Sequence, residues 1–164
     1  WRWAGVPFYL RTGKRLAAKS SQIVIEFRRE PVELFSAWGC DVSQANTLCL
    51  RIGPDEGIRL RFDAKVPGQR RLLRPVPMDF SYDASFASAT PEAYEHLILE
   101  AIRGEPALFI RADEAEAAWR LADSIREVWE NHGAPPLRMY PPGSWGPPEA
   151  DALFGDPYKR WHPL

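Results

Sequence analysis

The sequence predicts an α+β fold: a largely antiparallel β-sheet with helices packed on one face. Three observations lead to this prediction. Apolar and polar residues alternate up to about residue 82, apolar residues then recur at helical spacing up to residue 133, and a proline-rich tail follows. With 164 residues and an apolar share of 45%, the chain has the size and composition of one domain with its own core.

Four segments alternate in the way that is typical of half-buried strands: residues 22–30, 46–53, 56–66 and 76–82. In the first segment, Ile23, Ile25 and Phe27 share one face. The sequence GPDEG, residues 53–57, predicts a turn between the second and third strands. One apolar and one polar face in each strand predict an antiparallel sheet that is covered on one side.

Two helices are expected after the strands. Thr90 is a candidate N-cap with Pro91 at the first helical position, and Gly104 ends this helix. Asp113 followed by Glu116 predicts an acidic capping box for the second helix.

The second helix is expected to end at Gly133 and carries an apolar stripe at helical spacing. The stripe consists of Trp119, Ala122, Ile125 and Trp129. We interpret it as core-facing packing rather than as a cofactor site.

The tail, residues 135–164, holds eight of the 16 prolines. It also carries five aromatic residues, whereas a disordered linker would be poor in them. They are Tyr140, Trp145, Phe154, Tyr158 and Trp161. We therefore expect an ordered tail that packs along the body, with a short helix in residues 147–154.

Composition excludes several classes of function. The net charge of −1 gives no basic excess for nucleic acid or a membrane surface, and no apolar run reaches membrane-spanning length. Cys40 and Cys49 form neither a disulfide framework nor a metal-ligand pattern, so we expect free thiols in a cytoplasmic protein. Because the chain begins with Trp1 and not with Met, we expect it to be a segment of a longer protein.

The three histidines do not indicate a metal site. His96 falls in the first predicted helix, His132 at the end of the second and His162 near the end of the chain. None has a metal-binding partner at ligand spacing, and a histidine at a helix C-terminus is favoured by the helix dipole alone. We expect no metal.

A basic cluster begins in the third strand: Arg59, Arg61, Lys65, Arg70, Arg71 and Arg74. It is either a nucleic-acid surface or a solvated or interface-facing sheet surface. The charges alternate along a strand and lack interleaved aromatic residues, which favours the second interpretation.

Arg11, Lys14 and Lys19 precede the first strand. They are either an anion-binding site or charges that keep a sheet edge from pairing with other chains. Thr12 and Gly13 let the backbone come close to a ligand, and lysine is a good partner for phosphate. The residues alone leave both interpretations open.

The segment RWAGVPFYLRTGKRLAAKSSQIVIEF resembles the hallmark W-x-G-V-P-F-x-x-R-x-G-K-x-L region of glucose-6-phosphate dehydrogenases. The similarity continues, in the family's order, through NTLCLRIGPDEGI, KVPG, MDFSY, PEAYEHLILEAIRGE, FIRADEAEAAW and YPPGSWGPPEAD. It spans nearly the whole chain, covers only the C-terminal part of that enzyme and is of the bacterial type. It implies the fold of that C-terminal part, whose sheet builds the subunit interface in the family.

The resemblance implies that the parent enzyme oxidises glucose 6-phosphate to 6-phosphogluconolactone in the pentose phosphate pathway. Hydride passes to NADP or NAD, which is bound mainly by an N-terminal Rossmann domain. The coenzyme loop, the H-Y-L-G-K segment and the His–Asp base do not occur in these 164 residues. The resemblance therefore implies that this segment alone is inactive.

The family pattern implies substrate contacts at Lys14 and Lys19, and Tyr94 resembles a tyrosine that approaches the substrate. Gly53 stands where many relatives have Gln, which implies one polar contact fewer.

Some eukaryotic members bind a second, structural NADP, and Arg11 and Arg51 match two of its contacts. Ser20, Val24 and Trp145 stand where that site uses basic residues, so the resemblance argues against a second NADP here. The expected partners are glucose 6-phosphate and further copies of the chain, in a homodimer or homotetramer. The alternative is a non-catalytic β-sheet interaction module that binds a partner subunit or an anionic ligand.

Overall fold

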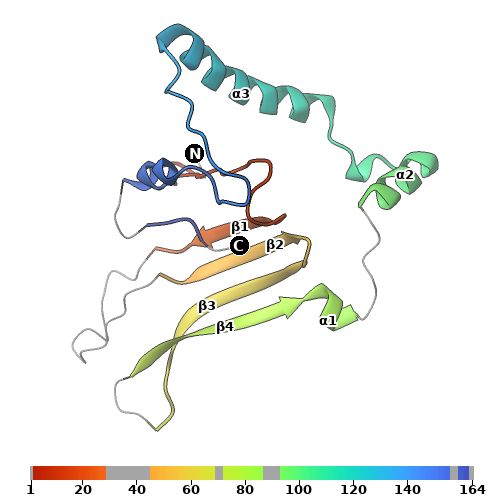
Figure 1. The fold of residues 1–164 in the computed structure, drawn as a ribbon. Coiled ribbons are helices and arrows are strands. Elements are labelled where there is room, and N and C mark those ends of the chain that lie inside the picture. The colour runs from red at the N-terminus through yellow and green to blue at the C-terminus, as the bar shows by residue number, and fades with distance from the viewer. Residues whose placement is uncertain (1, 29–44, 69–71, 87–92, 156–158, 163–164) are drawn as a thin grey trace. The chain divides into compact units, whose positions relative to one another are not determined.

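The computed structural model describes residues 2–28, 45–68, 72–86, 93–155 and 159–162 (Figure 1). They fall into two compact units, each described here by itself. The first unit is Trp1–Ser88 with Met139–Leu164, and the second is Ala89–Arg138. The predicted α+β class is confirmed: the first unit contains an antiparallel sheet and the second contains helices.

The sheet has four antiparallel strands in the order β1-β2-β3-β4. Their bounds are Ser21–Glu26 for β1, Thr47–Gly53 for β2, Gly57–Lys65 for β3 and Leu73–Ser81 for β4. All four predicted strands are present, because period-two alternation is a local property of each segment. The last predicted residues of the first strand, 29 and 30, lie outside the described residues.

One face of the sheet is apolar. The register pairs Ile23 with Leu50, Leu50 with Ile58, and Ile58 with Phe80, so an apolar row crosses all four strands. Ile23 is 50% exposed and Met78 is 61% exposed, and no apolar side chain among the described residues is buried. The described side chains of this face therefore have the composition of a core surface.

The opposite face is charged. Val24, Cys49, Arg59 and Asp79 form a row across the four strands. Asp79 accepts hydrogen bonds from Arg51 at 2.8 Å and from Arg59 at 2.5 Å. The carboxylate thus ties β2 and β3 to β4, and the cross-strand pairing of opposite charges stabilises the sheet.

These arginines change the acidity of Asp79. The hydrogen bond from Arg59 is the largest cause that lowers the pKa of Asp79, and the bond and charge of Arg51 add to it. Cys49, a free thiol on the same face, has a raised pKa because burial disfavours its thiolate. Cys40 lies outside the described residues.

The described residues also form three α-helices and two 3₁₀ helices. They are α1 (Tyr82–Phe86), α2 (Ala93–Arg103), η2 (Pro106–Leu108), α3 (Ala112–His132) and η3 (Pro148–Phe154). The predicted cap at Thr90 lies outside the described residues. The capping box predicted at Asp113 is wrong: Arg111 is the N-cap, and its backbone N–H donates to the carboxylate of Glu114 at 3.1 Å. The helix starts two residues earlier because Glu114, not Glu116, reaches the free N–H.

The predicted core-facing stripe of α3 does not face a core within the described residues. Trp119 is 64% exposed, Ile125 is 47% exposed and Trp129 is 49% exposed. That helices pack on one face of the sheet stays a prediction, because α2 and α3 belong to the second unit. Among the described helices, none has the length and apolarity that a membrane crossing requires.

We predict that Asp79→Asn lowers the melting temperature at about pH 7, because the carboxylate loses its attraction to two arginines. A group with a lowered folded-state pKa stabilises the protein above its unfolded pKa, and this contribution is lost as the pH falls through the folded value. The difference from the original protein should therefore shrink below about pH 4. Thermal unfolding followed by circular dichroism at several pH values measures this difference in melting temperature.

The matched control is Asp63→Asn. Asp63 lies two residues from Arg61 on β3 and forms no ion pair among the described residues. If Asp79→Asn has no larger effect than this control at neutral pH, or if its effect does not depend on pH, the ion pairs do not stabilise the sheet.

Candidate functional site

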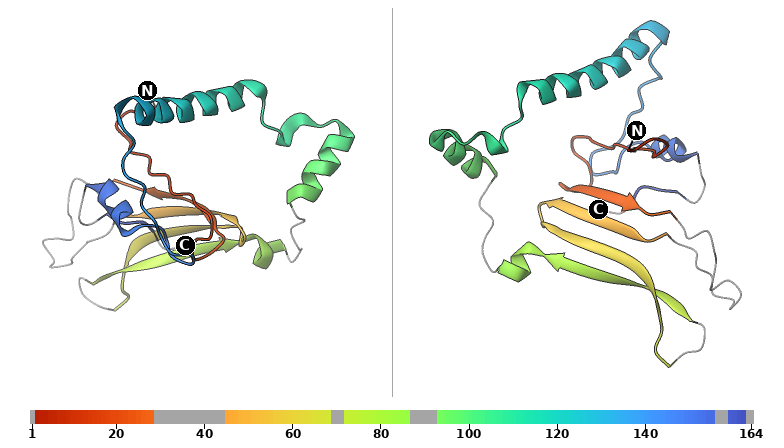
Figure 2. Two further views of the ribbon diagram at one scale, coloured as in Figure 1. Left: turned by 45° about the horizontal axis from the view of Figure 1, so that its top comes forward. Right: turned by 180° about the vertical axis from the view of Figure 1, so that it is seen from behind.

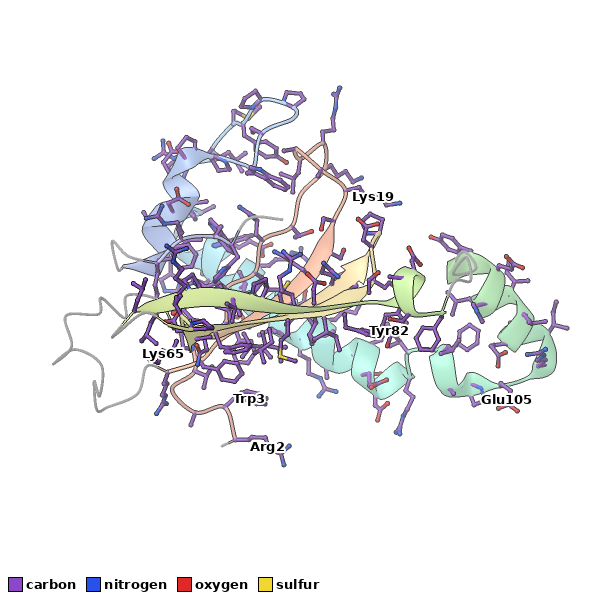
Figure 3. All side chains as sticks on the ribbon, turned by 90° about the horizontal axis from the view of Figure 1, so that it is seen from below. Arg2, Trp3, Lys19, Lys65, Tyr82 and Glu105 are labelled. Atoms are coloured by element: carbon purple, nitrogen blue, oxygen red, sulfur yellow. The ribbon has the colours of Figure 1, made fainter. Side chains whose placement is uncertain are left out.

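The candidate substrate residues lie in the segment that precedes β1. We call residues 11–19 the lysine loop. Lys14 and Lys19 are both exposed, and Lys19 lies two residues before the first strand (Figure 3). The start of β1 pairs with Gly53, and Gly57 pairs with Ser81, so Lys19 lies at the end of the sheet where β4 also ends.

The lysine loop is bound by a turn of the tail, residues 140–144, which we call the tail turn (Figure 2). Tyr140 Oη donates to the backbone oxygen of Lys14 at 3.0 Å. The backbone N–H of Gly143 donates to the oxygen of Arg15 at 2.8 Å, and the N–H of Ala17 donates to Ser144 at 3.1 Å. Three hydrogen bonds thus fix the backbone of the loop at Lys14, Arg15 and Ala17.

The backbone of the loop is strained at one point. Arg15 has φ +56°, a left-handed conformation that residues other than glycine rarely adopt. At Gly13, which precedes Lys14, a Cβ would lie 3.0 Å from Tyr140 Oη, so a larger residue would require a small shift of the tyrosine. The sequence therefore has a glycine where the tyrosine hydroxyl approaches the loop.

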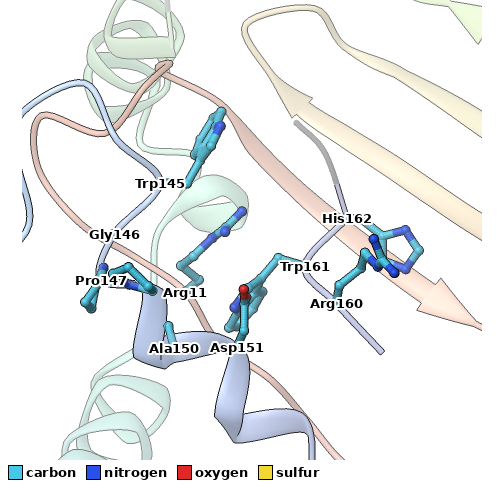
Figure 4. Close-up of a pocket in the computed structure, with 10 residues that line it drawn as sticks. Arg11, Trp145, Gly146, Pro147, Ala150, Asp151, Arg160, Trp161 and His162 are labelled. Atoms are coloured by element: carbon cyan, nitrogen blue, oxygen red, sulfur yellow. The ribbon is translucent and has the colours of Figure 1, made fainter. Parts of the chain in front are cut away.

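A groove of about 520 Å³ lies beside the loop (Figure 4). The guanidinium of Arg11 lies 4.7 Å from the ring centre of Trp161 and 5.3 Å from that of Trp145. Asp151 and Arg160 also line the groove. Cation–π attraction to two indoles holds the guanidinium of Arg11 against the tail, and the N–H donors at the edge of the stacked plane remain available.

Aromatic contacts join the tail to the chain start. The Tyr9 ring lies 4.6 Å from that of Phe154, and the Phe154 ring lies 5.1 Å from that of Trp161. His162 Nε2 lies 3.7 Å from the carboxylate of Glu26 at the end of β1. Aromatic and electrostatic contacts therefore support the same association that the tail turn makes through hydrogen bonds.

The structure brings together some of the residues that the sequence singled out. Arg11, Lys14 and Lys19 lie on one loop, but Arg11 lines the groove and neither lysine does. Tyr94 is the second residue of α2, in the other unit, and is 70% exposed. Gly53 ends β2, and a Cβ there would meet open space.

Tyr140, Gly143 and Ser144 were not singled out as functional residues. Only the high aromatic content of the proline-rich tail pointed to packing there.

Two residues of the basic cluster carry structural roles. Within the basic cluster, Arg59 pairs with Asp79 and Arg61 donates to the backbone oxygen of Ala45 at 2.7 Å. Arg70 and Arg71 lie outside the described residues. The described part of the chain contains no group of three histidine, cysteine or carboxylate side chains that could hold a metal ion.

We predict that Arg11→Ala loosens the tail. The loss of contact with two indoles should reduce the free energy of unfolding by roughly 1–2 kcal/mol. Arg11→Lys should give a free energy of unfolding between those of the original protein and Arg11→Ala, because an ammonium group lacks the planar stacking surface of a guanidinium. Urea unfolding followed by tryptophan fluorescence measures both. An unchanged midpoint in Arg11→Ala would show that the stacking adds no stability.

Comparison with known proteins places the whole chain in one family. The model of the family described as glucose-6-phosphate dehydrogenase, C-terminal domain, matches residues 1–162. The chain is 48% identical to the glucose-6-phosphate 1-dehydrogenase of Chlamydia pneumoniae and 45% identical to that of Mycolicibacterium smegmatis. Each alignment covers 99% of this chain and 32% of the relative. The chain thus spans about a third of the length of these relatives.

Two solved structures share the fold. A glucose-6-phosphate 1-dehydrogenase from Mycobacterium avium gives a TM-score of 0.75 at 31% identity, over 100% of this chain and 33% of that one. A glucose-6-phosphate dehydrogenase in complex with its substrate glucose 6-phosphate gives 0.72 at 31% identity, over 90% of this chain and 30% of that one. Since the match spans residues 1–162, the chain belongs to the glucose-6-phosphate dehydrogenase C-terminal domain family.

Proposed function

We propose that these residues are the C-terminal part of a glucose-6-phosphate dehydrogenase. The parent enzyme oxidises glucose 6-phosphate to 6-phosphogluconolactone in the pentose phosphate pathway, with hydride transfer to NADP or NAD. The observation that carries the proposal is the family match over residues 1–162, together with two exposed lysines on a loop whose backbone is fixed. A solved relative that is similar over 90% of the chain was determined with glucose 6-phosphate.

The lysines would bind the sugar phosphate. An ammonium group donates charge-assisted hydrogen bonds to phosphate or hydroxyl oxygens, each worth about 1.5–3 kcal/mol. Lys14 and Lys19 have no ion-pair partner among the described residues, so no carboxylate there competes with a substrate oxygen. Their role is to bind and position, because protonated lysines do not accept the proton that leaves the sugar hydroxyl. Tyr94 would add a further substrate contact.

The remaining chemistry belongs to other parts of the enzyme. A bound nicotinamide coenzyme accepts the hydride, and a general base takes the proton. Neither the G-x-x-G-D-L-type coenzyme loop nor the H-Y-L-G-K segment occurs among the 164 residues. This part supplies one side of the sugar-phosphate site.

We extend the proposal to assembly and location. The described part of the sheet has an apolar face with exposed Ile23 and Met78, which supports packing of that face against other protein surfaces, in the rest of the enzyme or in a second copy. We propose a cytoplasmic homodimer or homotetramer, with the arginine-bearing face in or beside the subunit interface. A second, structural NADP is not part of the proposal, because Ser20, Val24 and Trp145 stand where that site uses basic residues.

We predict that Lys14→Ala and Lys19→Ala in the intact enzyme each raise KM for glucose 6-phosphate by roughly 10–100-fold, since each removes one charged hydrogen bond. KM for the coenzyme should stay within about twofold. Steady-state kinetics with each substrate varied in turn measures this.

Lys159→Ala is the matched control, because Lys159 is exposed on the tail and does not line the groove. If both loop variants keep the KM and kcat of the original enzyme, the lysines are charges that protect the sheet and the anion site is wrong.

We also predict that the isolated 164-residue chain reduces neither NADP nor NAD in the presence of glucose 6-phosphate. It carries no general base in a suitable setting and no coenzyme loop, and two lysines replace neither. The absorbance of reduced nicotinamide measures turnover, with the intact enzyme as a positive control. Turnover above that of a mock purification from the same host would place catalytic groups within these residues.

A further inference from the structure

We propose that the tail turn is a positioning element for substrate binding and that Tyr140 acts on the substrate through Lys14. This inference rests on the proposed function, since it assumes that Lys14 binds the sugar phosphate. It adds Tyr140, a residue 126 positions from Lys14 in the sequence, to the residues that act on the substrate.

The hydrogen bond from Tyr140 lies on the main chain of the lysine loop. Tyr140 Oη donates to the main-chain oxygen of Lys14, and not to its side chain. The ammonium group therefore remains free to bind a ligand, while the Cα from which the side chain extends is fixed. A long, flexible side chain loses less conformational freedom on binding when its backbone is already in place.

Arg15, next to Lys14, has a strained backbone conformation. A left-handed conformation at a residue other than glycine persists only where the surroundings determine it. Here the carbonyl of Arg15 accepts the hydrogen bond from Gly143, and the N–H of Ala17 donates to Ser144. The tail turn thus fixes the conformation of the loop on both sides of its disfavoured residue.

Tyr140 contacts the lysine loop next to a glycine. Gly13 adjoins Lys14, and a Cβ at Gly13 would lie 3.0 Å from Tyr140 Oη and 3.3 Å from Leu16 Cδ2. The tyrosine therefore reaches a part of the loop that carries no side chain. Gly143 itself has φ +81°, so the tail turn also needs a glycine to direct its N–H at Arg15.

The test is a double-mutant cycle in the intact enzyme with Tyr140→Phe, Lys14→Ala and the double variant. Tyr140→Phe keeps the ring and removes the one hydroxyl. We expect it to raise KM for glucose 6-phosphate roughly three- to tenfold, with kcat and KM for the coenzyme within about twofold. In the Lys14→Ala background, Tyr140→Phe should raise KM no further, because its effect passes through Lys14.

Tyr9→Phe is the matched control. Tyr9 joins the tail to the chain start through its ring, so the variant keeps that packing and leaves the lysine loop alone. It should keep the original KM. Melting temperatures of all variants separate a loss of folded protein from a loss of affinity.

The outcomes distinguish the two proposals. If Lys14→Ala does not change KM, the proposed function is wrong and this inference is wrong with it. If Lys14→Ala raises KM and Tyr140→Phe does not, or if the two effects are additive, only the inference is wrong. Should Tyr140→Phe fail to fold, Gly143→Ala strains the second hydrogen bond of the turn at φ +81°, and the same pattern of KM is expected from it.

Discussion

The candidate site depends on three hydrogen bonds between the tail turn and the lysine loop. They join Tyr140 to Lys14, Gly143 to Arg15, and Ala17 to Ser144. All three acceptors are backbone oxygens, so the contact determines the path of the chain and leaves the lysine side chains available. Without it, the strained conformation at Arg15 would have no partner in the tail, and Lys14 would extend from an open loop.

The two faces of the sheet have different requirements. On the charged face, Asp79 pairs with Arg51 and Arg59 within the chain, while the buried Nε of Arg51 has no hydrogen-bond partner among the described residues. On the apolar face, Ile23 and Met78 remain exposed. A surface of this composition is stable in water when another protein surface covers it, which agrees with a chain that spans about a third of its relatives.

The strands could be predicted from the sequence because alternation at Ile23, Leu48 and Ile58 is visible within each segment. The predicted start of α3 is two residues too late, because Asp113, Glu114 and Glu116 all suit a first helical turn. Only the structure shows that Glu114 is the carboxylate that accepts from the N-cap N–H. Charge and spacing alone did not decide whether Lys14 and Lys19 bind an anion or keep a sheet edge from pairing with other chains. The family pattern favoured anion binding. The bond from Tyr140 to Lys14 could not be predicted, since no local pattern links residues 126 positions apart.

The most direct test of this account is amide hydrogen exchange of the intact enzyme, resolved for segments 12–18 and 139–146. The account predicts that both segments are protected, because Ala17 and Gly143 donate their N–H groups across the contact. It also predicts that Tyr140→Phe increases exchange in both segments together, while exchange in β2 and β3 stays unchanged. Exchange at the rate of an open loop in either segment of the original enzyme would contradict the account.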